Sequence, residues 1–244
     1  MINNNAFEEI NIKFSAAISS VTVERGLSNV KGFKQKYQKA FNTMHPIPHI
    51  AFGNKKLPKT TAIYNIGTWF LCPGRLNGFC ELSTECYAKC REVMGSVIQS
   101  RLNNYLFWKT NDAETIAKFI SYSIKTEQLK GNNVNLLRFN EVGEIETQEE
   151  LKKMIKISNI VYLKTGIKSY VYTHNRGLNF DIERPNLTIC GSGFMVDNKF
   201  TVVKPEDYKE YVNNSNCIEC PQKCELCGSI CSRKLGVEIV EVLK

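Results

Sequence analysis

Nine of the ten cysteines in this chain fall into two groups, and their spacing is the clearest chemical signal in the sequence. The first group is Cys72, Cys80, Cys86 and Cys90, and the second is Cys217, Cys220, Cys224, Cys227 and Cys231. Thiolates this close together repel one another unless a positive centre lies among them. Short gaps between cysteines let one loop surround a compact iron–sulfur cluster, as in ferredoxins. Both groups therefore predict metal binding.

The spacing of the second group favours iron–sulfur over zinc. Zinc ribbons separate their two C-x2-C pairs by about 15–20 residues, so that each pair forms its own hairpin. The gap between Cys220 and Cys224 is too short for that arrangement. We expect a [4Fe–4S] cluster here, with a zinc site and a redox-active thiol group as alternatives. Five cysteines compete for four ligand positions, so one is spare.

The first group is spaced more widely, and two interpretations stay open. The C-x3-C-x2-C pattern of radical S-adenosylmethionine (SAM) enzymes is absent. Three cysteines on one loop would nevertheless leave one iron of a cubane open to a ligand. A closed site that also uses Cys90 would instead serve structure or electron transfer.

The segments around these cysteines predict strands that alternate with helices. We expect strands at 61–71, 133–139, 170–173, 187–190 and 237–243. We expect helices at 29–43, over 93–106, after the N-cap Asp112, after Thr147 with Glu150 as a capping box, and from Pro205. This order predicts a parallel sheet with helices outside it. Binding sites in such sheets lie at the carboxyl ends of the strands.

Polar residues follow several of these strands and are candidate ligand contacts. Asn140 and Glu141 end one strand, and His174, with its neighbour Arg176, ends the next. Arg138 lies inside an apolar strand, where a buried guanidinium needs a partner. A solvated acidic loop is the alternative for Glu141, and a structural role is the alternative for His174. The isolated Cys190 is expected to be a thiol of the core.

Length and composition limit the class of protein. The 244 residues can bury a full core, and no run approaches the roughly 18 apolar residues of a membrane span. We expect a reducing cytoplasm, where clustered cysteines hold metal. The net charge of +8 would fall by about four if two cubanes with four thiolates each were bound. An ordinary solvated surface is favoured, with a weak preference for nucleic acid as the alternative.

The stretch from Thr60 carries a family resemblance. The segments CPGRLNGFCELSTECYAKC, LLRFNEVGEI and YVYTHNR, with the terminal cysteines, resemble the bacteriophage gene-product-eighty-eight family over about residues 58 to 232. Cys72, Cys80 and Cys86 match the cysteines of the family's loop, whereas Cys90 stands where a basic residue is usual. The resemblance implies a partial (β/α) barrel like the radical-SAM fold, with a cysteine-rich C-terminal segment that binds a cluster.

The resemblance also implies cofactors and a division of the chain. One or two [4Fe–4S] clusters are expected, with SAM as a further cofactor. In a SAM-dependent site, Glu141 could hold the ammonium group of the ligand. We expect an extension at 1–58, the partial barrel at 59–204 and the cysteine-rich segment with a closing strand at 205–244. Localisation is expected in the cytoplasm, that of the host cell if a phage encodes the chain.

Two functions remain open from the sequence. One is a radical-SAM-like enzyme that modifies a macromolecule or metabolite. The other is a non-catalytic iron–sulfur protein that senses redox state or transfers electrons. A zinc-stabilised interaction module is a third and weaker alternative. The sequence identifies neither the substrate nor a redox partner.

Overall fold

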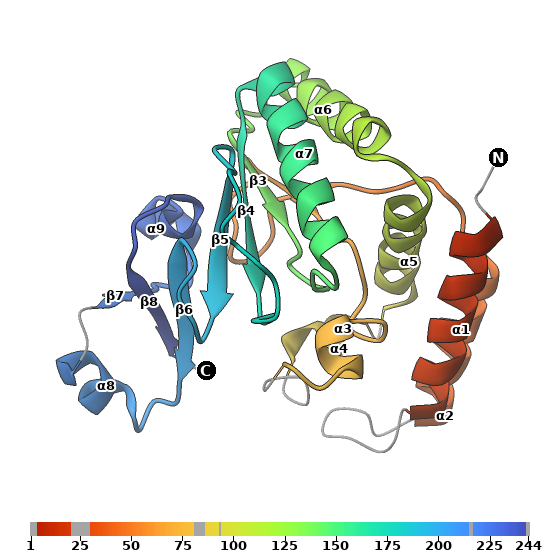
Figure 1. Ribbon diagram of the computed structural model, residues 1–244, viewed down its shortest axis with the longest axis horizontal. Helices are drawn as coiled ribbons and strands as arrows, with labels where there is room; N and C mark the ends of the chain where they lie inside the picture. Colours follow the sequence, from red (N-terminus) through yellow and green to blue (C-terminus); the bar gives the residue numbers. More distant parts are fainter. Residues whose placement is uncertain (1–3, 21–29, 81–85, 93, 215–216, 243–244) are drawn as a thin grey trace.

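The protein is built on one eight-stranded, mostly parallel sheet (Figure 1). The computed structural model describes residues 4–20, 30–80, 86–92, 94–214 and 217–242. The strands are β1 (Ala51–Phe52), β2 (Thr61–Tyr64), β3 (Leu136–Phe139), β4 (Lys168–Thr173), β5 (Leu187–Ser192), β6 (Asn198–Val203), β7 (Cys217–Glu219) and β8 (Glu238–Val242). Their spatial order is β1-β2-β3-β4-β5-β6-β8-β7, and β1 pairs with β2 in the antiparallel sense.

The other strand pairs in this order run parallel. The expected α/β class with a parallel sheet is therefore confirmed. The pairing runs from β1 at one edge to β7 at the other, and the described residues show no pairing between these edges. The predicted partial barrel stays a prediction. None of the described helices is long and apolar enough to cross a membrane.

Helices α6 (Ala113–Leu129) and α7 (Gln148–Thr165) cover one face of the sheet (Figure 1). Successive side chains of a strand alternate between its two faces. Tyr64, Leu137 and Ile189 point toward the helices and pack against apolar residues such as Ile120 and Met154. This main core fixes the registers of β2 to β5 relative to one another.

A second core joins the N-terminal helices to the first cysteine loop. Helices α1 (Asn4–Ser20) and α2 (Val30–Asn42) pack beside α5 (Gly95–Thr110). Phe14 and Tyr37 from these helices contact Phe70, which lies just before Cys72. The predicted helix at 29–43 is confirmed by α2. The N-terminal segment thus packs directly on the residues that lead into the cysteines.

The predicted strand over 61–71 is wrong beyond Tyr64. After β2, the side chain of Asn140 accepts a hydrogen bond from the N–H of Ile66 (3.1 Å), and that of Asn65 accepts one from Val142 N–H (3.0 Å). Gly143 has a φ of 101° and would place a Cβ 3.1 Å from the nitrogen of Gly67. Only glycine allows this approach at that backbone angle. The chain therefore leaves the sheet early, although 66 and 68–71 stay buried.

The C-terminal segment covers the opposite face of the sheet. It contains α8 (Tyr208–Asn214), α9 (Cys224–Cys227) and the 3-10 turn η1 (Ile230–Ser232). A third, smaller core forms here and includes Tyr170, Cys190 and Cys231. The closing strand is confirmed as β8, which lies between β6 and β7. The predicted short helix begins at Tyr208 rather than at Pro205, because 205–207 form a turn.

Both predicted N-caps are present. The carboxylate of Asp112 accepts a hydrogen bond from Thr115 N–H (2.7 Å), and the hydroxyl of Thr147 accepts one from Glu150 N–H (3.2 Å). In a regular capping box, the side chain of Glu150 would accept a hydrogen bond from the N–H of the N-cap, Thr147. Here it accepts one from Glu146 N–H instead. The local sequence thus fixed where α6 and α7 begin.

Removing the cap of α7 is expected to weaken the fold measurably. Thr147→Ala should lower the free energy of unfolding by about 1 kcal/mol, because it leaves a helix N–H without its acceptor. Urea denaturation monitored by circular dichroism measures the change. Thr126→Ala is the control, since the exposed hydroxyl of Thr126 bonds only within α6 to the carbonyl of Tyr122. Equal losses in the two variants would contradict the capping role.

Candidate metal centre

Cys72 and Cys86 each precede a short helix, α3 (Pro73–Leu76) and α4 (Tyr87–Arg91). Pro73 favours the start of a helix because its position needs no N–H. The N–H groups of Gly74 and Arg75 lie close enough to the Cys72 sulfur to lower the pKa of that thiol, and those of Ala88 and Lys89 act similarly on Cys86. The CPG and CYA motifs therefore give both sulfurs the same kind of backbone environment.

The first cysteine loop folds back on itself at Gly74. The N–H of Cys80 donates to the carbonyl of Gly74 (3.0 Å). A Cβ at Gly74 would lie 3.0 Å from the Cβ of Cys80 and 3.6 Å from the sulfur of Cys72. Cys72 and Cys80 therefore both lie next to the position that a side chain of Gly74 would occupy, and the charge of Cys86 raises the pKa of Cys72. The sequence expectation that these three cysteines converge is consistent with this geometry.

The side chain of Cys90 and residues 81–85 lie outside the described part of the structure. The backbone of Cys90 belongs to α4. The nine cysteines whose side chains are described are free thiols. Among the described residues, no three His, Cys, Asp or Glu side chains form a group that could hold a single metal ion.

Three cationic side chains lie beside this loop, and two of them are buried. The guanidinium of Arg75 and the ammonium of Lys89 lie 4.8 Å and 5.6 Å from the ring centroid of Trp69. Lys89 and Arg101 are only 3% and 7% exposed, and both lower the pKa of Cys86. Burial is nevertheless the largest influence and raises the pKa of Cys86 above its usual value. Positive charge is thus placed where thiolates would need it.

Burial and, to a smaller extent, the nearby charge of Glu144 raise the pKa of Cys72 to about 12. Cys72 is therefore a neutral thiol at pH 7 unless a metal displaces its proton. Thiolate formation and metal binding are coupled at this position.

Glu92 connects the segment before Cys72 with helices α4 and α5. It is the C-cap of α4, and its buried carboxylate accepts hydrogen bonds from Trp69 N–H (2.8 Å) and from the guanidinium of Arg101 on α5 (2.7 Å). Burial raises the pKa of Glu92 to about 7, although Arg101 acts in the opposite direction. The segment before Cys72 and the helix after Cys86 are held by the same ion pair.

The predicted polar residues at the carboxyl ends of β3 and β4 contact different partners. Asn140 is buried and holds Ile66, whereas Glu141 accepts a hydrogen bond from the side chain of Asn54 (2.6 Å) at an exposed position. Arg176 lies 5.4 Å from the ring centroid of Phe194 and contacts the carbonyl of Gly193. His174 donates its backbone N–H to Glu144 (2.7 Å).

Glu144 is the carboxylate that the sequence interpretation missed. It is buried and accepts hydrogen bonds from the hydroxyl of Thr173 (2.7 Å) and from His174 N–H. Its negative charge raises the pKa of Cys72. Burial raises its pKa to about 7. Val142 and Ile145, close to it in the sequence, are apolar and buried. These apolar neighbours could have indicated that Glu144 is buried, unlike the other glutamates of the loop.

A cavity of about 420 Å³ lies between α1 and α3, beside this loop. Its lining includes Pro73, Arg75, Lys13 and Glu146. Lys13 and Glu146 form an ion pair (2.6 Å) in its lining.

Arg138 lies on the other face of the sheet, away from the α6–α7 layer. Its guanidinium lies 4.9 Å from the ring centroid of Tyr172 and 5.8 Å from that of Tyr170. Burial raises the pKa of Cys224, and the hydrogen bond with Cys190 lowers that of Cys231; Arg138 lowers both to a smaller extent and so lies within electrostatic range of the second cysteine group. The sequence placed Arg138 with the strand-end residues, but the alternation of the strand directs it to this face.

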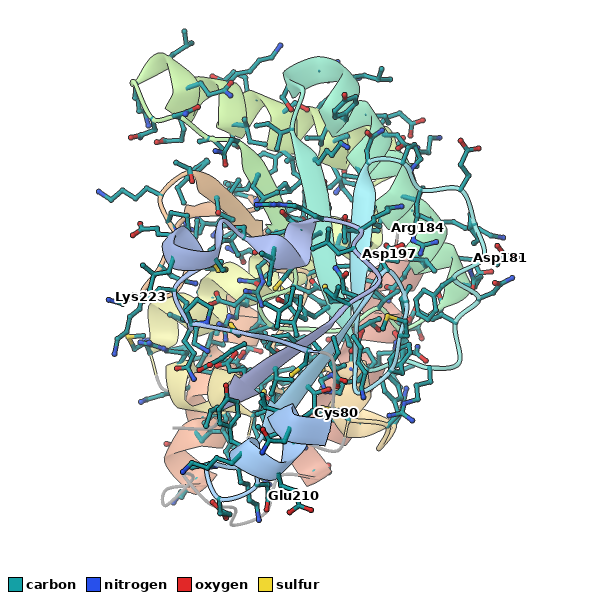
Figure 2. All side chains as sticks on the ribbon, turned by 90° about the vertical axis from the view of Figure 1, so that its left-hand side faces the viewer. Cys80, Asp181, Arg184, Asp197, Glu210 and Lys223 are labelled. Atoms are coloured by element: carbon teal, nitrogen blue, oxygen red, sulfur yellow. The ribbon has the colours of Figure 1, made fainter. Side chains whose placement is uncertain are left out.

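The two cysteine groups occupy different parts of the molecule. In Figure 1, α3 and α4 lie below the tips of the strand arrows, whereas α9 lies beside β8 and β6 at the far side of the sheet. Figure 2 likewise shows Cys80 well apart from Lys223, the residue before α9. The structure thus favours two separate sites over a single site shared by both groups.

Comparison with known proteins gives a family but no characterised relative. No curated protein and no solved structure matches the chain. The family model described as Gene product 88 matches residues 27–223, which include the first cysteine group and, of the second, Cys217 and Cys220. The match begins well before the stretch on which the resemblance rested. This chain belongs to the Gene product 88 family.

Proposed function

We propose that this chain is an iron–sulfur protein that holds a [4Fe–4S] cluster in its first cysteine loop. The observation that carries the proposal is the convergence of Cys72 and Cys80 around Gly74, with Cys86 in electrostatic range. Thiolates are the ligands that iron–sulfur clusters take. The buried cations Lys89 and Arg101 offset the negative charge that such a site accumulates.

The position of the loop also fits a bound cofactor. It follows β2 at the carboxyl edge of a parallel sheet, where ligands of α/β folds bind. The ligands of a cubane bind different irons, so its thiolates lie farther apart than the roughly 3.8 Å that tetrahedral zinc–sulfur bonds allow. A loop that brings its thiols together from two short helices suits that wider spacing.

Iron and sulfide analysis tests the proposal directly. Protein purified without oxygen should be brown and contain iron and acid-labile sulfide in equal amounts. Replacing Cys72, Cys80 and Cys86 together by alanine should remove about four irons per chain. Asn77→Ala, an exposed change in the same loop, should leave the iron content unchanged. Wild-type protein that holds zinc or no metal would refute the proposal, as would a triple variant with undiminished iron.

A second candidate function, SAM-dependent chemistry, is favoured by one observation. Glu144 is a buried carboxylate near Cys72 and could hold the ammonium group of SAM, the role first considered for Glu141. A cluster held by three thiolates would leave one iron open for the methionine part of SAM and, once reduced by an external donor, would supply the electron for that chemistry. The chain's own contribution is to orient that ligand and to exclude water.

Electron paramagnetic resonance of the reduced protein separates the two functions. A change of the signal on adding SAM, weakened in Glu144→Gln, is expected for the enzyme. An unchanged signal would leave a redox-sensing or electron-transfer protein. The substrate, the redox partner and any contact with nucleic acid stay predictions.

A further inference from the structure

The second cysteine group is held by several strands at once. The N–H of Cys220 donates to the carbonyl of Val240 in β8 (2.7 Å), and that of Cys224 donates to Lys56 in the connection before β2 (3.0 Å). Cys231 lies in η1, which contacts β4 and β5. The thiol of Cys190 on β5 lies 3.3 Å from the carbonyl oxygen of Cys231. The segment is therefore anchored across the sheet face that α6 and α7 leave uncovered.

Four thiols of this group are close enough to influence one another. Cys224 and Cys227 are three residues apart at the two ends of the single-turn helix α9, so their side chains lie on one face of it. Burial raises the pKa of Cys224 and of Cys220 to about 11, and Cys227 and Cys231 contribute to both shifts. Cys220 and Cys231 also pack into the same small core. These four thiols therefore lie on the same side of the sheet, within electrostatic range of one another.

Cys217 faces elsewhere. It lies two residues before Glu219 in β7, so these two side chains share one face of the strand and Ile218 takes the other. Glu219 and Cys217 both act on the phenol of Tyr208 in α8 and raise its pKa. Cys220 lies beyond the strand and turns toward Cys231. The five cysteines therefore divide into four that converge and one that points to α8.

We propose that Cys220, Cys224, Cys227 and Cys231 hold a second [4Fe–4S] cluster on this face, that Cys217 is not a ligand, and that Arg138 is a positioning residue that sets the cluster's reduction potential. This inference rests on the proposed iron–sulfur function. A four-thiolate cubane carries a charge of about −2, and reduction adds another negative charge. The half-buried guanidinium of Arg138 on this face therefore favours the reduced form.

The ligand assignment is tested in the variant that lacks Cys72, Cys80 and Cys86. This protein should retain about four irons and four sulfides per chain. Adding Cys227→Ser should remove them, whereas adding Cys217→Ser should not. Circular dichroism establishes that both variants fold alike. If the wild type holds iron but the triple variant holds none, the second cluster is overturned and the proposed cluster in the first cysteine loop is unaffected. An iron-free wild type would refute both, and loss of iron in the Cys217→Ser variant would overturn the assignment.

The role of Arg138 is tested by redox titration of the same triple variant. Arg138→Gln should lower the ratio of reduced to oxidised cluster about tenfold at a fixed potential, a shift of about 59 mV to more negative values. Arg138→Lys keeps the charge and should restore most of the ratio. Arg233→Gln removes an exposed arginine of the same segment and should change little, because solvent screens its charge. Equal potentials for the triple variant with and without Arg138→Gln, both with about four irons per chain, would overturn the role of Arg138.

Discussion

Arg101→Met is expected to lower the free energy of unfolding by about 3–5 kcal/mol, because it leaves the buried carboxylate of Glu92 without its cation. Both side chains are almost fully enclosed, at 8% and 0% exposure for Arg101 and Glu92. Urea denaturation under anaerobic conditions measures the loss. Because Glu92 also holds Trp69 N–H and ends α4, the variant should load less iron at Cys72 and Cys86.

Two companion variants separate the ion pair from general damage to the core. In Arg101→Met with Glu92→Leu, the buried carboxylate is removed together with its cation, so much of the lost stability should return. Lys156→Met breaks the exposed pair with Glu114 on α6 and should have little effect. Arg101→Met with near wild-type stability would show that Glu92 does not depend on this partner.

Glu144→Gln is expected to remove a pH dependence of stability. The pKa of Glu144 is raised from its usual 4.5 to about 7, so the folded protein binds this proton more tightly than the unfolded chain. Its contribution to stability is therefore complete below pH 4.5 and is lost as the pH rises through about 7. The total is about 3 kcal/mol, of which about 2 kcal/mol falls between pH 5.5 and 8. Glutamine stays neutral and should not show this loss.

Urea denaturation at pH 5.5 and at pH 8 measures the effect as the difference between wild type and variant. Glu92 also has a raised pKa and contributes a slope of the same sign, so some pH dependence should remain in Glu144→Gln. Glu149→Gln, an exposed change on α7, should keep the full wild-type dependence. Parallel curves for wild type and Glu144→Gln would contradict the buried, proton-binding state of Glu144.

Local patterns determined much of the helical layer and the fold class. Asp112 and Thr147 cap helices because a side-chain oxygen needs only a backbone N–H a few residues away. The alternation of strands and helices was sufficient to predict a parallel sheet. The cysteine spacing indicated two groups of candidate ligands, and the motifs before α3 and α4 indicated the family.

Only tertiary structure decided where these residues meet. Whether 65–71 continue β2 depends on Asn140 and Gly143, which lie far along the chain. The insertion of β8 between β6 and β7, the distinction between Glu141 and Glu144, and the turn of Cys217 toward α8 depend on the same kind of long-range pairing. Sequence spacing specifies which residues are neighbours along a loop. Burial and the face of a strand, which set pKa values and ligand geometry, arise only when distant segments pack together.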